Sequence, residues 1–166
     1  MIRNFSKRTF IALPLALALA ACGGETGSEG ADASVTGSEA PAEIAERQDN
    51  FKGLSDSFKV IRTELEGDPD MAAISVAATD MNARAQRITG LFPEGTSMDA
   101  GYDTEALAAI WERPEDFEAA AQRLVDETAT MMTLAEGGDA AAIAEQVAAV
   151  GGSCKGCHDN FRLDDD

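Results

Sequence analysis

The segment IAEQVAAVGGSCKGCHDNFR, residues 143–162, sets the architecture of this 166-residue chain. Its apolar residues recur at steps of three and four, which places them on one face of a helix. The motif Cys154-Lys155-Gly156-Cys157-His158 lies within this pattern. Positions i, i+3 and i+4 of a helix point to one side, so both cysteines and the histidine are expected to share the apolar face.

Three earlier segments repeat the same apolar step and predict three more helices. Four amphipathic helices bury their apolar stripes by packing together. The sequence therefore predicts an all-α, antiparallel up-down four-helix bundle over residues 43–163, followed by an acidic tail at residues 164–166. The three earlier stripes cover residues 44–65, 71–92 and 117–135.

Turn-forming residues separate the predicted helices. Residues 90–104 are rich in Gly, Pro, Ser and Asp and predict a long connection between the second and third helices. A short helical turn is expected over residues 105–111. Pro114 suits the first turn of the third helix, and Gly137-Gly138 is expected to end it.

The N-terminal residues 1–21 resemble an export signal. Three basic residues precede an apolar run at residues 10–21 that only Pro14 interrupts. This run is too short to cross a bilayer as a mature helix, and a signal h-region has this length. We therefore expect export to the periplasm and exclude residues 1–21 from the fold.

The signal-like run ends in Leu19-Ala20-Ala21-Cys22-Gly23, which resembles the lipobox of bacterial lipoproteins. The alternative is ordinary cleavage that leaves Cys22 as a free thiol. Of the three cysteines, two belong to the C-terminal motif, and an odd exported thiol has no other evident role. Lipidation of Cys22 is the favoured interpretation, with residues 22–42 as a flexible tether.

The chain is strongly acidic, with a formal net charge of −17. Loss of residues 1–21 removes three positive charges and no acidic ones, which leaves −20. Such a charge excludes nucleic acid as a partner, and it excludes electrostatic binding to an anionic membrane. A membrane would hold the protein through its lipid only, and a basic redox protein is the kind of partner that the charge favours.

C-x-x-C-H is the attachment signature of c-type haem. The thiols of Cys154 and Cys157 would add to the two haem vinyl groups, and the imidazole of His158 would bind the iron from the same side. A zinc site needs four ligands, and apart from Cys154, Cys157 and His158 the chain has no other His and only one other Cys, Cys22. A thioredoxin-like dithiol belongs in a βαβ context, which the sequence lacks. We predict one covalent haem, buried between the helices.

The residues around this motif, Cys154 to Arg162 at the end of the last of four helices, resemble the cytochrome c′ family. Arg47-Gln48, Leu91-Phe92-Pro93 and residues 104–111 also resemble that family's pattern. The resemblance covers about residues 44–162. One departure is Ala108, where the family usually has Pro, and it loosens the alignment of residues 104–109.

The resemblance implies which residue faces the iron opposite the histidine. In the family this position lies four residues after the first-helix arginine, where low-spin members carry a methionine ligand. Here it is Phe51, which has no lone pair to donate, so a five-coordinate, mainly high-spin iron is expected. A methionine from elsewhere is the competing ligand. The candidates are Met71, Met81, Met98, Met131 and Met132.

The resemblance also implies contacts to the haem periphery. Arg47 falls on an apolar stripe, where a cation needs a partner, and with Gln48 it is expected to bind a propionate. The alternative is that Arg47 reaches past the edge of the bundle to solvent. Arg162 is expected beside the histidine face or, alternatively, as an exposed charge at a helix end. Thr104 and Glu105 are further candidates for the haem edge.

Two functions remain open. The first is binding of nitric oxide or carbon monoxide on the apolar face beside Phe51, as the resemblance implies. The second is one-electron transfer through a six-coordinate low-spin haem, with the acidic surface steering a redox partner. No catalytic constellation accompanies the motif, so no enzymatic activity is expected. The family often forms homodimers through its first two helices, and that is a further expectation.

Overall fold

The computed structural model describes residues 40–163. The signal-like segment, Cys22, most of the tether and the acidic tail therefore lie outside the described residues. The helical elements in chain order are α1 (Ala42–Glu64), α2 (Met71–Ala85), η1 (Ile88–Leu91), η2 (Met98–Ala100), α3 (Ala109–Glu112), α4 (Pro114–Gly137) and α5 (Ala140–Phe161).

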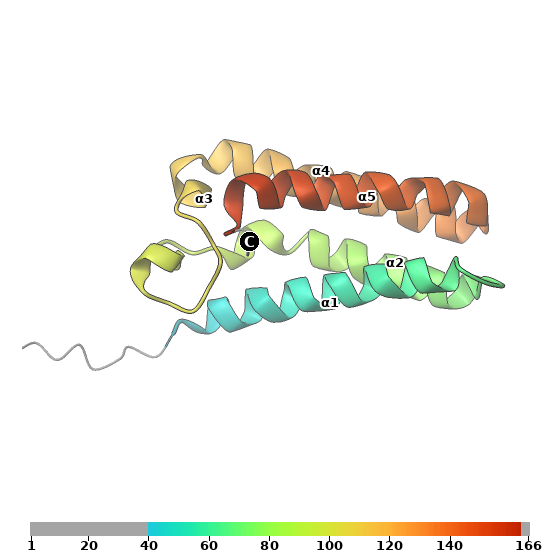
Figure 1. Ribbon diagram of the computed structural model, residues 1–166, viewed down its shortest axis with the longest axis horizontal. Helices are drawn as coiled ribbons and strands as arrows, with labels where there is room; N and C mark the ends of the chain where they lie inside the picture. Colours follow the sequence, from blue (N-terminus) through green and yellow to red (C-terminus); the bar gives the residue numbers. More distant parts are fainter. Residues whose placement is uncertain (1–39, 164–166) are drawn as a thin grey trace, which may run out of the picture. The chain divides into compact units, whose positions relative to one another are not determined.

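The four long helices form a bundle whose sequential members run in opposite directions (Figure 1). Helix α1 packs against α2, α2 against α4, and α4 against α5. Within residues 40–163 the only β-type pairing is an isolated bridge between Ala106 and Arg162. The predicted all-α, antiparallel four-helix bundle is confirmed.

Local chemistry explains where the long helices begin and end. The carboxylate of Asp70 accepts hydrogen bonds from the backbone N–H groups of Ala72 and Ala73, so α2 starts at Met71. Asp139 caps α5 in the same way. Pro114 occupies the first turn of α4, and Gly138 ends that helix with φ +71°, a conformation that favours glycine.

The core is made by one stripe from each long helix. Ile61, Ile74, Met131 and Ile143 are each fully buried and come from α1, α2, α4 and α5. On α1 the predicted stripe divides into two parts. Leu54 and Ile61 belong to the core, whereas Phe51 and Phe58 are only half-buried and line a cavity.

Two predicted elements differ from the structure. The second helix ends at Ala85 and is followed by η1. Pro93 disfavours helical backbone at Phe92, the residue that follows η1, so no helix continues beyond it. The short helical turn expected over residues 105–111 lies at Ala109–Glu112 instead. Residues 105–107 are held by backbone hydrogen bonds to the end of α5, from Leu107 N to Phe161 O and from Leu163 N to Glu105 O.

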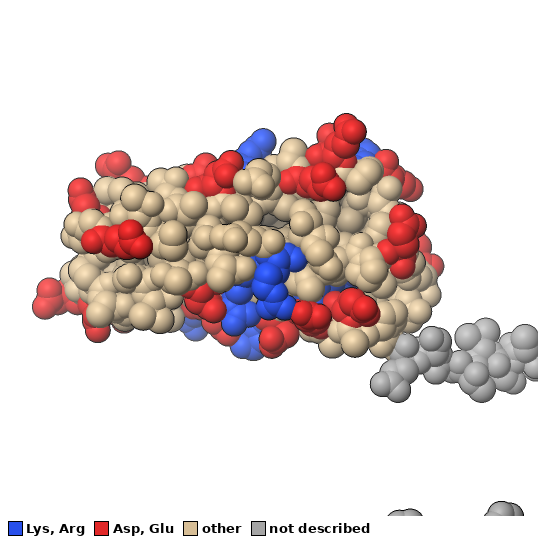
Figure 2. Space-filling view, turned by 180° about the vertical axis from the view of Figure 1, so that it is seen from behind, with Lys and Arg blue, Asp and Glu red and all other residues tan. Residues whose placement is uncertain are grey.

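The chain as a whole is acidic, with 30 Asp and Glu against 13 Lys and Arg. Figure 2 shows the face opposite to that of Figure 1, where acidic side chains are scattered and the basic ones gather near the middle. Among residues 40–163, no helix combines the length and the apolar character needed to cross a membrane.

Candidate functional site: a pocket between α1, α4 and α5

A cavity of about 680 Å³ lies between α1, α4 and α5 and extends to the loop before α3. This volume falls within the roughly 300–1,000 Å³ typical of small-molecule sites. Its interior walls are mainly apolar. They include Leu54, Phe58, Ile88, Ile110, Phe117, Ala120, Ala121, Leu124 and Phe161.

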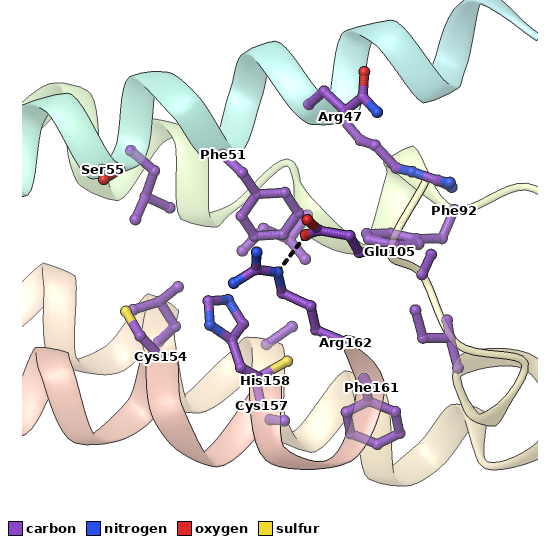
Figure 3. Close-up of a pocket in the computed structure, with 18 of the residues that line it drawn as sticks. Arg47, Phe51, Ser55, Phe92, Glu105, Cys154, Cys157, His158, Phe161 and Arg162 are labelled. Carbon is purple, nitrogen blue, oxygen red and sulfur yellow. Dashed lines mark hydrogen bonds and ion pairs between the residues drawn. The ribbon is translucent and has the colours of Figure 1, made fainter. Parts of the chain in front are cut away.

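Cys154, Cys157 and His158 all line this cavity from α5. Because they occupy positions i, i+3 and i+4 of one continuous helix, they project from the same side of it (Figure 3). Both cysteines are half-buried free thiols packed against the core. The sequence therefore located correctly which face of the last helix these three side chains occupy.

Burial keeps both thiols protonated. It raises the pKa of Cys154, and it raises the pKa of Cys157 to about 11, with a smaller contribution from the neighbouring Cys154. At neutral pH neither sulfur carries a charge in the apolar cavity. A thioether is also uncharged, so covalent attachment at these sulfurs introduces no charge into the pocket.

Phe51 projects into the cavity from α1, on the wall opposite His158 (Figure 3). Its ring packs edge-on against Phe92, with 6.3 Å between the ring centroids. The five methionines considered as competing ligands are all absent from the lining of this cavity. Met81 and Met131 are fully buried in the core of the bundle instead.

Arg47 is a buried cation at one end of the cavity, with 3 % of its surface exposed. Its guanidinium donates to Thr96 Oγ1 (2.8 Å), to the Thr96 carbonyl oxygen (2.6 Å) and to Thr104 Oγ1 (2.6 Å). Burial lowers the pKa of Arg47. The alternative in which Arg47 reaches out to solvent is therefore wrong.

The acceptors of Arg47 are all uncharged. Among residues 40–163 no carboxylate forms an ion pair with it. A guanidinium has five N–H donors, and three hydrogen bonds leave two of them for a ligand. Gln48 and Thr104 line the same end of the cavity, with the Gln48 side chain donating to the Asp103 carbonyl oxygen at 3.0 Å. This end of the pocket can therefore receive an anionic group.

Glu105 and Arg162 line the cavity next to His158 and form an ion pair, with 2.5 Å between Arg162 Nε and Glu105 Oε2 (Figure 3). Both side chains are nearly half exposed. Arg162 is therefore not simply an exposed charge at a helix end. The pair joins the C-terminus of α5 to the extended residues 105–107.

Several lining residues were not identified as site residues from the sequence. Phe92 and Phe117 form an edge-on pair with centroids 4.9 Å apart, and Phe117 continues to Phe161 at 5.4 Å. Phe58 lies seven residues after Phe51, so the helical period alone could have placed it on the same wall. The Phe92 contact depends on the path of the loop after α2, which periodicity does not give.

The donor set and the cavity together fit a covalently bound haem. One wall offers two thiols and one imidazole, the interior is apolar, and one end holds an arginine with unused donors. Among the described residues no group of three or more His, Cys, Asp and Glu side chains could hold a metal ion by itself. A ligand that brings its own iron matches this arrangement.

Comparison with known proteins gives the same assignment. The model of the family described as Cytochrome C' matches residues 42–162. Cytochrome c′ of Rhodospirillum rubrum is 36% identical over 128 residues, which cover 75% of this chain and 84% of the relative.

Solved structures agree with the sequence matches. Cytochrome c′ from Thermochromatium tepidum is 27% identical with a TM-score of 0.69, covering 74% of this chain and 95% of that one. A cytochrome c′ described as having ligand-controlled dimer dissociation is 25% identical with a TM-score of 0.71, covering 78% and 100%. The chain therefore belongs to the cytochrome c′ family, whose members carry one covalently attached haem c.

Proposed function

We propose that this protein binds nitric oxide and carbon monoxide at an open axial position of its haem iron. In this proposal Cys154 and Cys157 would hold the haem covalently, and His158 would ligate its iron. The iron supplies the binding site for the diatomic gas. The protein's own residues decide which molecules can reach that site.

The observation that carries the proposal is the position of Phe51 on the wall opposite His158 (Figure 3). Phenylalanine cannot ligate iron, and none of the five candidate methionines lines the cavity. The axial position facing α1 would therefore have no protein ligand. A small uncharged gas can bind in these apolar surroundings once the ring of Phe51 moves aside, whereas an anion would lose its hydration without compensation.

Arg47 and Gln48 would fix the orientation of the haem. Arg47 has unused N–H donors at one end of the cavity, and a propionate carboxylate would accept charge-assisted hydrogen bonds from them. Thr96 and Thr104 hold the guanidinium in place for this contact. The only histidine of the chain serves as the axial ligand, and we assign the protein no catalytic role.

Electron transfer is the second candidate, and one observation favours it. Gln48, Lys52 and Ser55 are exposed residues that also line the cavity, so an edge of the bound haem would lie close to solvent. A redox partner could exchange electrons across this edge. On the face of the bundle that Figure 2 shows, the acidic side chains are scattered and form no single docking patch.

Carbon monoxide distinguishes the two candidates. The purified holoprotein would be reduced and titrated with carbon monoxide while its absorption spectrum is recorded. The gas-binding function predicts a saturable shift of the main haem band. A low-spin ferrous spectrum that carbon monoxide leaves unchanged would reject it and favour the electron carrier.

We also propose export to the periplasm and anchoring through a lipid on Cys22, on the support of the N-terminal sequence pattern alone. Cys22→Ser should move the protein from the membrane fraction to the soluble periplasmic fraction without loss of haem.

Homodimer formation is a further proposal, supported by the dimeric relative with a TM-score of 0.71. Sedimentation of the protein with and without carbon monoxide would test it.

A further inference from the structure

Four side chains around the pocket contact the ring of Phe92. Its ring lies edge-on to Phe51 at 6.3 Å and to Phe117 at 4.9 Å, and tilted against Trp111 at 6.2 Å. The guanidinium of Arg47 lies over the same ring, with Arg47 Cζ 5.0 Å from the centroid. Phe92 therefore links the residue opposite His158 to the residue expected to bind a propionate.

The backbone around Phe92 is also held in place. The Trp111 indole N–H donates to the Phe92 carbonyl oxygen at 3.1 Å. The hydroxyl of Thr96 donates to the Pro93 carbonyl oxygen at 2.8 Å while it accepts from Arg47. The ring of Phe92 thus has contacts on several sides and a fixed main chain.

Phe51 is held much less firmly. Within residues 40–163 its one ring-to-ring contact is with Phe92, and its side chain borders the cavity half-buried. A gas molecule that binds opposite His158 must share the space in front of Phe51. The ring of Phe51 would have to move for the ligand to enter, whereas the Phe92 ring that it packs against has further contacts to Trp111, Phe117 and Arg47.

We propose that Phe92 is a positioning residue that holds Phe51 over the open axial position and so limits the rate of ligand entry. The inference rests on the proposed gas-binding function and adds to it the residue that sets the rate. Phe92 acts through Phe51 and not by contact with the iron. Loss of the Phe92 ring should let Phe51 move aside more easily.

The test measures the association rate of carbon monoxide with the ferrous holoprotein by stopped flow. Phe92→Leu and Phe92→Ala should each raise this rate about three- to tenfold, because one aromatic pair that resists the movement is lost. Phe92→Tyr keeps the ring and should retain the wild-type rate. Ile74→Val loosens the core at a buried position away from the cavity and should leave the rate unchanged.

A double-mutant cycle separates action through Phe51 from simple widening of the pocket. In a Phe51→Ala background, Phe92→Leu should change the rate less than about twofold, since no ring remains to be held. Rate increases that multiply in the double variant would overturn the inference while leaving gas binding intact. A wild-type ferrous protein that takes up no carbon monoxide would overturn the proposed function, and this inference with it.

Discussion

Arg47 Nη2 on α1 donates a 2.6 Å hydrogen bond to Thr104 Oγ1, which lies 57 residues further along the chain. The same nitrogen donates to the carbonyl oxygen of Thr96 at 2.6 Å. A buried guanidinium therefore joins the first helix to the loop that closes one end of the pocket. This link forms without any carboxylate, so it leaves the positive charge available to the cofactor.

Arg47→Leu should destabilise the protein, because two threonines lose a charged hydrogen-bond partner and the loop loses its attachment to α1. A hydrogen bond to a charged group contributes about 1.5–3 kcal/mol, so a loss of about 2 kcal/mol or more is expected. Urea unfolding of the holoprotein, followed by circular dichroism, would measure it.

Arg123→Leu is the matched control, because Arg123 is exposed on α4. It should change the unfolding midpoint far less than Arg47→Leu does. Arg47→Lys should fall between the two, since lysine keeps the charge but lacks the planar fork that reaches both threonines. Equal midpoints for Arg47→Leu and Arg123→Leu would show that the buried hydrogen bonds contribute nothing to stability.

The helical period predicted most of the bundle and one wall of the site. The three-and-four step located the four long helices, and the i, i+3, i+4 spacing placed Cys154, Cys157 and His158 on one face. These features are local, because a helix of known period determines which side chains point together. Arg47 was also recognisable, since a cation on an apolar stripe requires a partner.

The contacts that close the pocket could not be predicted in the same way. Thr96 and Thr104 meet Arg47 only because the loop between α2 and α3 folds back across the bundle. Residues 105–107 form backbone hydrogen bonds with the end of α5, which moves the short helix α3 to Ala109–Glu112. Such contacts depend on the path of a loop, and a loop has no sequence period from which to read its path.

Covalent attachment through Cys154 and Cys157 can be tested by mass. A variant with both residues changed to alanine, made in cells able to attach haem c, should lack the mass of one haem. Each single variant should still retain haem after denaturation, through one thioether. Cys22→Ser, which alters the cysteine outside the motif, should keep the full haem mass. A double variant that retains covalent haem would contradict the assignment.

Asp80 links α1 to α2 and should make stability depend on acidic pH. The Ser57 hydroxyl donates to it at 2.7 Å and Arg84 Nε at 2.7 Å, and these contacts hold the pKa of Asp80 below its usual value. A lowered pKa in the folded state stabilises the fold above the unfolded-state pKa of about 3.9, and the contribution is lost as the pH falls further. Asp80→Asn should therefore lower the free energy of unfolding at pH 7.

The difference between wild type and Asp80→Asn should shrink as the pH falls below about 4, because the carboxyl of the unfolded chain is then protonated first and proton binding favours the unfolded state. Asp49→Asn is the control, since Asp49 is an exposed carboxyl on α1, the helix whose Ser57 contacts Asp80. It should produce a smaller change at pH 7. A difference for Asp80→Asn that stays constant from pH 7 to pH 3 would rule out the ionised carboxylate as its source.

The position of Phe51 opposite His158 is the central claim, and the spin state of the iron in wild type and Phe51→Met tests it most directly. Electron paramagnetic resonance and absorption spectra of the ferric proteins would be compared. We predict a mainly high-spin, five-coordinate wild type and a variant shifted toward six-coordinate low spin, because methionine offers a sulfur ligand where phenylalanine offers none. A low-spin wild type, or a Phe51→Met spectrum identical to a high-spin wild type, would contradict the account.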